Sequence, residues 1–358
     1  MSVFIIAEAG VNHNGSLSTA QRLIDVAAAA GADAVKFQTF KASKVVSRHA
    51  PKAEYQERTI GETESQFDML EKLELSESAH RALHAYAIAR GIQFLSTPFD
   101  VDSLHFLVRE LGLRIIKIPS GEITNAPFLL QVAHTGCRII LSTGMSTMEE
   151  VREALSILSF GVSMPMAAAP SRQAFEKAYV TEEGQRRLHE RVTVLHCTTE
   201  YPAPLDDINL KAMNAMADEF HLPVGYSDHT LGIYVPIAAV ARGAVLVEKH
   251  FTLDRNMPGP DHHASLEPDE LSRMVQAIRE IERVLGDGIK RPAPVEYKNR
   301  NVARRRLTAA RDIAEGERFS SENLVCKRPG IGLSPIHYWE YLGKPAPRAY
   351  RTDEAIEP

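Results

Sequence analysis

The 358-residue sequence has little of what marks a secreted, membrane-bound or nucleic-acid-binding protein. Its three cysteines, Cys137, Cys197 and Cys326, are widely spaced and odd in number, so they indicate neither a disulfide framework nor a cysteine metal site. No apolar run is long enough to span a bilayer, and Met1 leads into a strand pattern without a signal peptide. A formal net charge of -5 gives no reason to expect nucleic acid or an anionic membrane as partner. We therefore expect a cytoplasmic protein.

Short apolar runs alternate with helical periodicity along most of the chain. The first run, Val3 to Ala7, is apolar throughout, as a strand buried on both faces should be. Eight such strand–helix units predict an α/β fold, the (β/α)8 TIM barrel, over residues 1–285. A doubly wound open sheet is the alternative, but Glu8 to Asn12 lacks the glycine-rich phosphate turn that it needs. Residues 160–191 break the rhythm and predict an elaborated loop, to which we assign no role.

The pattern changes after Leu285. Residues 286–303 carry Pro292 and Pro294 and predict an extended linker. Residues 304–358 show short apolar pieces broken by glycine and proline turns, which predicts a small module with little helix. A module of this size is near the lower limit for independent folding, so we expect it to lean on its own barrel or on a partner's.

Two histidines follow the last two predicted strands of the barrel. His229 comes after the run Pro223 to Tyr226, and His250 after Ala244 to Val247. If these parallel strands are neighbours about 4.8 Å apart, both imidazoles project from one rim and are close enough to hold a divalent ion. For either histidine alone, a hydrogen bond to a nearby loop explains its presence equally well. His13, His262 and His263 lie in loops and are weaker metal candidates.

In a TIM barrel the side chains at the carboxyl ends of the strands form the site. Lys36 and Lys117 are conspicuous there because the strands are otherwise nearly devoid of charge. A single lysine at such a position is explained equally well as a side chain that extends to solvent. Two lysines among several hydroxyls predict a pocket for an anion such as phosphate. The predicted rim positions are Glu8, Lys36, Gln38, Thr97, Lys117, Ser120, Glu122, Ser142, Thr198, Ser227, His229 and His250.

Four further charged residues lie near this rim. Asp261, in the loop after the eighth strand, either contacts substrate or forms a simple turn. Asp228 and Glu200 are candidates for caps or solvated charges, and Lys249 is a candidate to point into the helix layer.

Several of these segments together resemble the sialic acid synthases, in the right order and nearly end to end. The barrel segments are Ile6 to Gly15, Val35 to Phe40, Phe94 to Asp100, Lys117 to Glu122, Gly225 to His229 and Glu248 to Thr252. Lys327 to Gly332 is similar to the C-terminal type III antifreeze-protein-like (SAF) module of those enzymes. Residues 160–191 lie outside the resemblance.

The resemblance implies a metal-dependent condensation of phosphoenolpyruvate with an N-acylated, mannose-type hexose and water, which gives a nine-carbon 2-keto acid and phosphate. It implies that phosphoenolpyruvate is held by Lys36, Thr97, Lys117, Ser120, Ser142 and Ser227. It implies that His229 and His250 hold the divalent ion, Mn²⁺ or Mg²⁺. The sugar would meet Glu8, Gln38, Glu122, Tyr201 and Asp261, together with Arg328 from the SAF module of the other subunit of a domain-swapped homodimer, and Thr198 is a further substrate-binding candidate.

The catalytic candidates that follow from the resemblance are Glu122, Glu8 and Lys117. Glu122 is the candidate to manage protons, although a carboxylate beside Lys117 is equally explained by a structural role.

One departure bears on the sugar. Thr198 stands where some sialic acid synthases have Asn, and with the segments Tyr201 to Pro204 and Gly225 to Thr230 it resembles the legionaminic acid synthases. Those enzymes use a 2,4-diacetamido-6-deoxy mannose in place of N-acetylmannosamine. We favour the legionaminate reading and keep N-acetylneuraminate synthase as the alternative. A third hypothesis is a non-catalytic sugar-binding barrel. The predicted pair of metal-binding histidines argues against it, because a binding protein does not need them.

Overall fold

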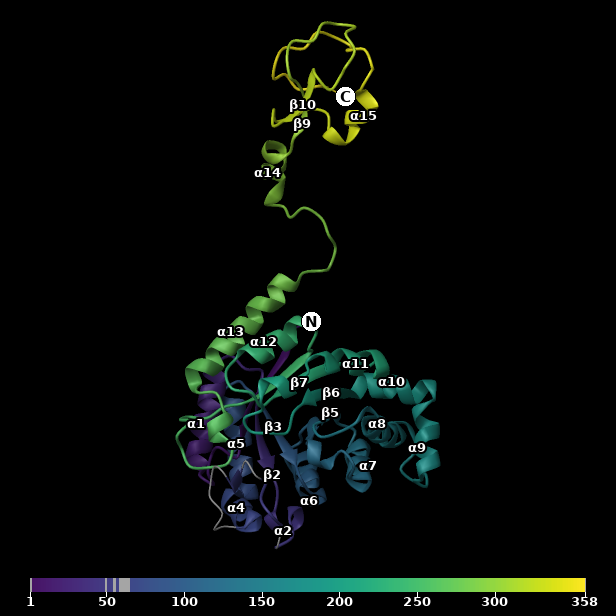
Figure 1. Cartoon of the computed structure of the whole chain (residues 1–358). Helices are drawn as coiled ribbons and strands as arrows, with labels where there is room; N and C mark the ends of the chain where they lie inside the picture. The colour runs from purple at the N-terminus through teal and green to yellow at the C-terminus, as the bar shows by residue number, and fades with distance from the viewer. Residues whose placement is uncertain (1, 49, 54–55, 58–64, 358) are drawn as a thin grey trace. The chain divides into compact units, whose positions relative to one another are not determined.

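The computed structural model describes residues 2–48, 50–53, 56–57 and 65–357. They form two compact units, Met1–Gly286 and Asp287–Pro358, which are coloured purple to green and green to yellow in Figure 1. None of the described helices combines the length and apolar composition needed to cross a membrane.

The first unit is a nearly closed barrel of parallel strands, which confirms the predicted TIM barrel. The hydrogen-bonded ladder runs β3-β2-β1-β8-β7-β6-β5-β4, and the two end strands, β3 and β4, also lie in contact. Each strand is followed by at least one helix on the outside of the barrel (Figure 1). The strands are β1 Phe4–Gly10, β2 Ala34–Thr39, β3 Gln93–Pro98, β4 Ile115–Ile118, β5 Arg138–Ser142, β6 Val192–Cys197, β7 Val224–Asp228 and β8 Leu246–His250.

Most helices begin at the polar caps that their sequences offer. Ser16 accepts a hydrogen bond from Thr19 N at the start of α1, and Asp100 accepts one from Ser103 N at the start of α6. The α-helices of the first unit are α1 Leu17–Ala29, α2 Ala42–Val45, α4 Gln66–Leu73, α5 Glu77–Ala89, α6 Val101–His105, α7 Ala126–His134, α8 Met148–Ser163, α9 Arg172–Tyr179, α10 Glu182–Arg191, α11 Lys211–Phe220, α12 Tyr234–Ala241 and α13 Pro268–Leu285.

The prediction of an elaborated loop over residues 160–191 was wrong in its main part. α8 continues to Ser163, and two further helices, α9 and α10, follow before β6. Their N-caps are Ser171 and Thr181, and each helix buries little more than one side chain, Ala178 in α9 and Leu188 in α10. Phe175, Ala178 and Tyr179 nevertheless recur at helical spacing in α9, so the sequence carried a helical period that the prediction overlooked.

The interior of the barrel is closed below the site by one layer of apolar side chains. Seven strands contribute one residue each: Ile6, Ala34, Leu95, Ile115, Ile140, Leu195 and Leu246. The remaining strand, β7, contributes Gly225, where an added Cβ would lie 2.5 Å from Leu246 O. The absence of a side chain thus lets β7 approach β8 and completes the floor.

The second unit has its own small core around an antiparallel strand pair, β9 Arg306–Ala309 and β10 Leu324–Lys327. The core residues are Leu307, Ala309, Ile313, Phe319, Leu324, Leu333, Ala346, Tyr350 and Ile356. A one-turn helix, α15 Tyr338–Tyr341, lies late in the unit.

The predicted extended linker contains a helix, α14 Glu296–Ala303. Pro292 and Pro294 precede its first turn, where proline is tolerated, and the Glu296 carboxylate accepts a hydrogen bond from Ala293 N at 2.7 Å. The prolines therefore lead into a helix and do not hold the whole segment extended.

Candidate active site

A cavity of about 270 Å³ opens at the carboxyl ends of the barrel strands. It brings together most of the side chains predicted from the sequence. These are Glu8, Lys36, Gln38, Thr97, Lys117, Ser120, Ser142, Tyr201, Ser227, His229, His250 and Asp261.

The deepest polar layer of the cavity stands two residues after the apolar floor on every strand. Side chains at i and i+2 of a strand point to the same side, so each inward floor residue predicts an inward site residue. This layer consists of Glu8, Lys36, Thr97, Lys117, Ser142, Cys197, Ser227 and Glu248. The strand register reinforces the arrangement, because Glu8 pairs with Lys36 on one side and with His250 on the other.

Four charged side chains of this layer form one buried cluster. Lys36 Nζ lies 2.7 Å from Glu8 Oε2 and 3.6 Å from Glu248 Oε2, and Lys117 Nζ lies 2.8 Å from Glu248 Oε1. Thr97 Oγ1 accepts a hydrogen bond from Lys36 Nζ, and Ser227 Oγ donates one to Glu248 Oε1. All four charged residues are at most 5% exposed. Each lysine therefore has an internal carboxylate partner when no ligand is bound.

Burial and pairing act in opposite directions on these groups. Burial raises the pKa of Glu8 to about 7, against the lowering effect of Lys36. Burial also raises the pKa of Glu248, but Lys117 and Lys36 outweigh it and the net pKa lies below its usual range. The pKa of Lys36 is raised because Glu248 and Glu8 outweigh its desolvation. Lys36 thus stays protonated, and Glu8 is the carboxyl of the cluster that protonates most readily near neutral pH.

The two predicted metal-binding histidines meet at the rim. Their ring centroids are 5.5 Å apart, and the Tyr201 ring packs 4.1 Å from that of His229. Burial lowers the pKa of His229 to about 4 and that of His250 well below its usual value, so both imidazoles are neutral, the form that binds metal ions. His229 Nδ1 lies 2.6 Å from Thr198 O, which orients the ring and leaves Nε2 for a ligand.

The surroundings of His250 fit a cation. Its buried Nδ1 has no hydrogen-bond partner among the described residues, and Asp261 Oδ2 lies 3.8 Å away. Burial raises the pKa of Asp261 to about 6. The described residues contain no group of three or more His, Cys, Asp or Glu side chains placed to hold a metal. The protein thus offers two imidazoles, and a bound ion would take its other ligands from water or substrate.

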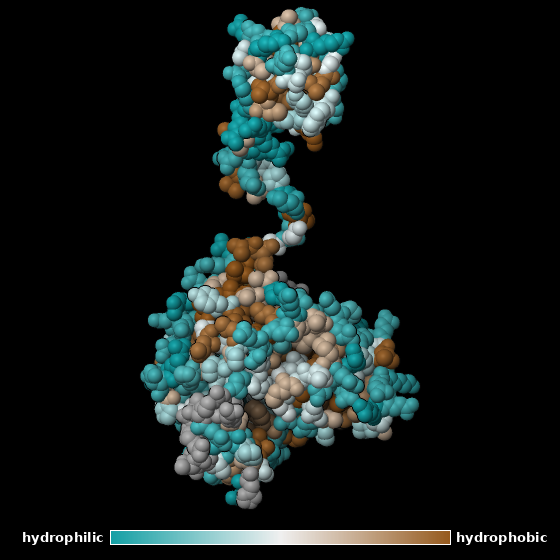
Figure 2. All heavy atoms as spheres, in the orientation of Figure 1, coloured by the Kyte–Doolittle hydropathy of each residue, from teal (hydrophilic) through white to brown (hydrophobic). Residues whose placement is uncertain are grey.

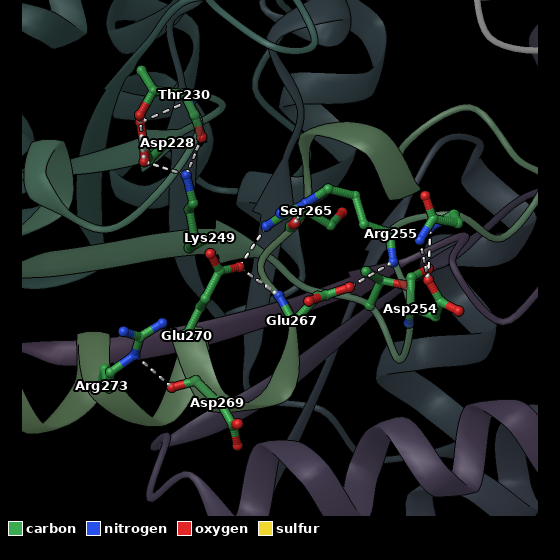
Figure 3. Close-up of polar contacts among 12 residues, drawn as sticks. Asp228, Thr230, Lys249, Asp254, Arg255, Ser265, Glu267, Asp269, Glu270 and Arg273 are labelled. Carbon is green, nitrogen blue, oxygen red and sulfur yellow. Dashed lines mark hydrogen bonds and ion pairs between the residues drawn. The ribbon is translucent and has the colours of Figure 1, made fainter.

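A buried ion pair links β7 and β8, the strands that lead to His229 and His250, on the side that faces the helices. Lys249 alternates with Glu248 and His250 on β8 and points into the helix layer, where its Nζ lies 2.5 Å from Asp228 Oδ2 on β7 (Figure 3). Both side chains are fully buried, and Thr230 also donates to the Asp228 carboxylate. Asp228 is therefore not a solvated charge, and the orientation considered for Lys249 is the one observed.

A second contact network holds the loop after β8, which carries Asp261. In Figure 3, Arg255 of this loop reaches toward Glu270 at the start of α13. Arg255 Nη2 lies 2.5 Å from Glu270 Oε2, and Arg255 Nε donates to Ser265 O at 3.2 Å. These contacts fix the loop against the helix that follows it.

Two predicted site residues of the first unit do not line the cavity, and a third lies in the second unit. Glu122 accepts a hydrogen bond from Asn125 Nδ2 at 2.6 Å, close to the start of α7. Thr198 points away because it alternates with Cys197 and Thr199, and its hydroxyl donates to Asp207 O at 3.2 Å. Arg328 belongs to the second unit, in which it is exposed.

Two of the loop histidines that were weaker metal candidates bond within the loops. His13 Nδ1 accepts a hydrogen bond from Gly15 N, and His262 lies 2.7 Å from Thr252 Oγ1 and 3.1 Å from Asn14 Oδ1. Burial lowers the pKa of His13 to about 3 and that of His262 to about 4, so both are neutral in the loop structure.

The most important residue that the sequence analysis missed is Glu248, the carboxylate between the two lysines. Thr199 and Cys197 were also missed, and all three line the cavity. The signal was available, because His250 was already expected at the rim and Glu248 stands two residues before it on the same strand.

Comparison with known proteins identifies the family. The NeuB family model matches residues 23–290 and the SAF domain model matches residues 304–358. The chain therefore belongs to the NeuB family and carries a C-terminal SAF domain, as the sequence motifs indicated.

Relatives cover nearly the whole chain. It is 51% identical over 352 residues to an N,N'-diacetyllegionaminic acid synthase of Campylobacter jejuni, covering 98% of both chains. It is 48% identical to the enzyme of that name from Legionella pneumophila, covering 96% of this chain and 90% of the relative. Among solved structures, an N-acetylneuraminic acid synthetase from Leptospira borgpetersenii aligns with a TM-score of 0.67 and 34% identity, over 85% of this chain and 93% of that one.

Replacement of one member of the buried Lys249–Asp228 pair should destabilise the barrel. In Lys249→Met the Asp228 charge stays buried without its partner, so we expect the free energy of unfolding to fall by about 3–5 kcal/mol. Chemical denaturation followed by circular dichroism measures the change. Adding Asp228→Asn to this variant should recover part of the loss, because the uncompensated charge is then removed.

The matched control is Lys44→Met, which breaks the exposed pair between Lys44 and Asp102. Exposed ion pairs contribute little, so its denaturation midpoint should stay close to that of the wild type. Equal midpoints for Lys249→Met and the wild type would contradict a supporting role of the buried pair.

Proposed function

We propose that the protein is a nonulosonic acid synthase that condenses phosphoenolpyruvate with a 2,4-diacetamido-6-deoxy mannose and water, releasing phosphate and a legionaminic-type nine-carbon 2-keto acid. It would thus act in carbohydrate biosynthesis. The observation that carries the proposal is the cavity, in which two buried lysines, several hydroxyls and two neutral histidines converge at the mouth of a NeuB-family barrel. The higher identity to two diacetyllegionaminic acid synthases than to the N-acetylneuraminic acid synthetase supports the choice of sugar.

The buried layer is suited to hold the phosphoenolpyruvate anion. Lys36 and Lys117 supply two charge-assisted donors, and Ser142 Oγ is buried without a hydrogen-bond partner among the described residues. Ser227 and Thr97 hydroxyls already bond within the cluster and can turn to the ligand. An anion that enters takes over the lysines from Glu8 and Glu248.

The reaction needs a carbon–carbon bond and a hydration. Carbon 3 of phosphoenolpyruvate attacks the aldehyde carbon of the open-chain sugar, water adds at carbon 2, and phosphate leaves from the tetrahedral product. Glu8, inside the cavity beside Lys36, is placed to exchange protons with that water. Glu122 was the first candidate for this task, but it lies outside the cavity lining, so we assign the task to Glu8.

His229 and His250 would hold one divalent ion, Mn²⁺ or Mg²⁺. Their neutral, buried rings and the unpartnered Nδ1 of His250 support this assignment. A divalent ion bound there supplies Lewis acidity for an aldehyde oxygen.

A coupled phosphate-release assay tests the activity. We expect phosphate to appear only when phosphoenolpyruvate and an acceptor sugar are both present. The diacetamido-6-deoxy sugar should give a higher kcat/KM than N-acetylmannosamine. Higher kcat/KM with N-acetylmannosamine would make the protein an N-acetylneuraminate synthase. Sugar binding without phosphate release would favour the non-catalytic barrel.

Removal of the histidines or of the ion should abolish turnover without unfolding the protein. We expect His250→Ala and His229→Ala to be inactive and to have lost bound metal, measured by elemental analysis of the purified protein. Chelator should inactivate the wild type, and Mn²⁺ should restore it. Thr252→Ser, on a buried residue outside the cavity, is the control and should keep its metal. Full activity after exhaustive chelation would contradict the assignment.

We further propose that the protein is a homodimer in which Arg328 completes the sugar site of the partner's barrel. The second unit has its own core and carries Arg328 on its surface. Apolar side chains gather at the end of α13, shown in brown in Figure 2, where Val284 is 74% and Leu285 50% exposed. Such a surface supports association with a second copy.

Mixing two inactive variants distinguishes a shared site from a site within one chain. His250→Ala and Arg328→Ala, combined under conditions of subunit exchange, should regain up to about a quarter of wild-type activity if pairing is random and two-fold. Half of the dimers are then mixed. In each mixed dimer, the barrel of the Arg328→Ala chain has an intact His250 and receives the intact Arg328 of the other chain. No recovery after demonstrated exchange would mean that Arg328 acts within its own chain.

A further inference from the structure

One wall of the cavity is apolar and does not come from the strand layer. We call it the apolar wall, and it consists of Val11, Val45, Met69, Leu70, Leu73 and Phe99. These residues belong to α2, α4 and the loops that follow β1 and β3. The cavity therefore has a charged end, built on the strands, and an apolar end, built on the segments beyond them.

The apolar wall is separate from the main core of the barrel. Val11, Phe40, Met69 and Leu73 form their own cluster, against which Val45, Leu70 and Phe99 pack. Phe40 and Phe99 meet edge to face, with ring centroids 6.0 Å apart. Val45, Leu70 and Phe99 are only half-buried although they line the cavity. Apolar surface is thus left facing the space where a ligand would lie.

The reaction fixes which part of the sugar reaches this wall. The new bond joins phosphoenolpyruvate, held by the lysines, to the aldehyde carbon, so carbon 1 of the sugar lies near the charged end. An open-chain hexose with carbon–carbon bonds of about 1.5 Å extends about 6 Å from carbon 1 to carbon 6. α2 and α4 follow β2 beyond its carboxyl end, at the mouth of the barrel (Figure 1). A sugar that extends in this direction would place carbons 4 to 6 at the apolar wall.

We propose that the apolar wall determines acceptor specificity: it selects a sugar with a methyl group at carbon 6 and an N-acetyl group at carbon 4 over one with hydroxyls there. Val45 and Leu70 are the specificity-determining residues. This inference rests on the proposed function, because it requires the acceptor to bind with its aldehyde at the charged end.

The chemistry of the two sugars gives the direction of the preference. Both substituents of the diacetamido-6-deoxy sugar end in methyl groups, which gain from contact with apolar side chains. The hydroxyls of N-acetylmannosamine would lose water against the same apolar side chains, which carry no acceptor, although the amides of Gln56 and Gln66 line the cavity beside them. Differences of this kind in apolar pockets change kcat/KM by about 10–200-fold.

Two substitutions that keep the shape of the wall and change its polarity test the proposal. Val45→Thr is isosteric, and Leu70→Asn replaces a half-buried leucine by a polar side chain of similar size. The measurement is the ratio of kcat/KM for the diacetamido-6-deoxy sugar to kcat/KM for N-acetylmannosamine. Each variant should lower this ratio about tenfold, while the KM for phosphoenolpyruvate stays within about twofold of the wild type.

Leu130→Asn in α7 is the matched control, since Leu130 is also a half-buried helical leucine but does not line the cavity. Its sugar ratio should equal that of the wild type. An unchanged ratio in both wall variants, or an equal loss on both sugars, overturns the inference and leaves the proposed function standing if the wild type prefers the diacetamido-6-deoxy sugar. A wild type that condenses neither sugar overturns both.

Discussion

The site depends on keeping two lysines and two glutamates buried together. Moving isolated charges out of water is costly, so Lys36 and Lys117 are tolerated in the barrel interior because Glu8 and Glu248 accompany them. These four side chains come from β2, β4, β1 and β8, and a slip of one residue in any of these strands would turn its charge toward the helices. The charge cluster and the strand register therefore constrain each other.

Much of this arrangement could be predicted from the sequence, because a strand has a strict two-residue period. Lys36, Lys117, Ser142 and Ser227 were found as polar residues after apolar runs, and all four lie in the cavity. Counting two residues back from His250 along the same strand gives Glu248, which also faces the cavity. Thr198 was expected at the rim because it follows the sixth strand, yet the period that places Cys197 inside the barrel turns the next residue outward.

Other features could not be predicted because they depend on contacts between distant segments. The apolar wall joins Val11, which follows β1, to Leu70 and Phe99, which lie far along the chain. Each residue alone is an ordinary apolar side chain, and the three-dimensional fold is needed to show that they face one ligand space.

In the proposed reaction, the internal carboxylates would also affect the end of each catalytic cycle. A phosphate that leaves a site with unpaired lysines has to separate from bare positive charge, which slows its departure. Here Glu8 and Glu248 lie within 2.7–3.6 Å of the lysine ammonium groups and can pair with them again as the phosphate moves away. In the proposed reaction the carboxylates would act as built-in counterions, which would weaken the hold on phosphate and reset the cavity for the next substrate.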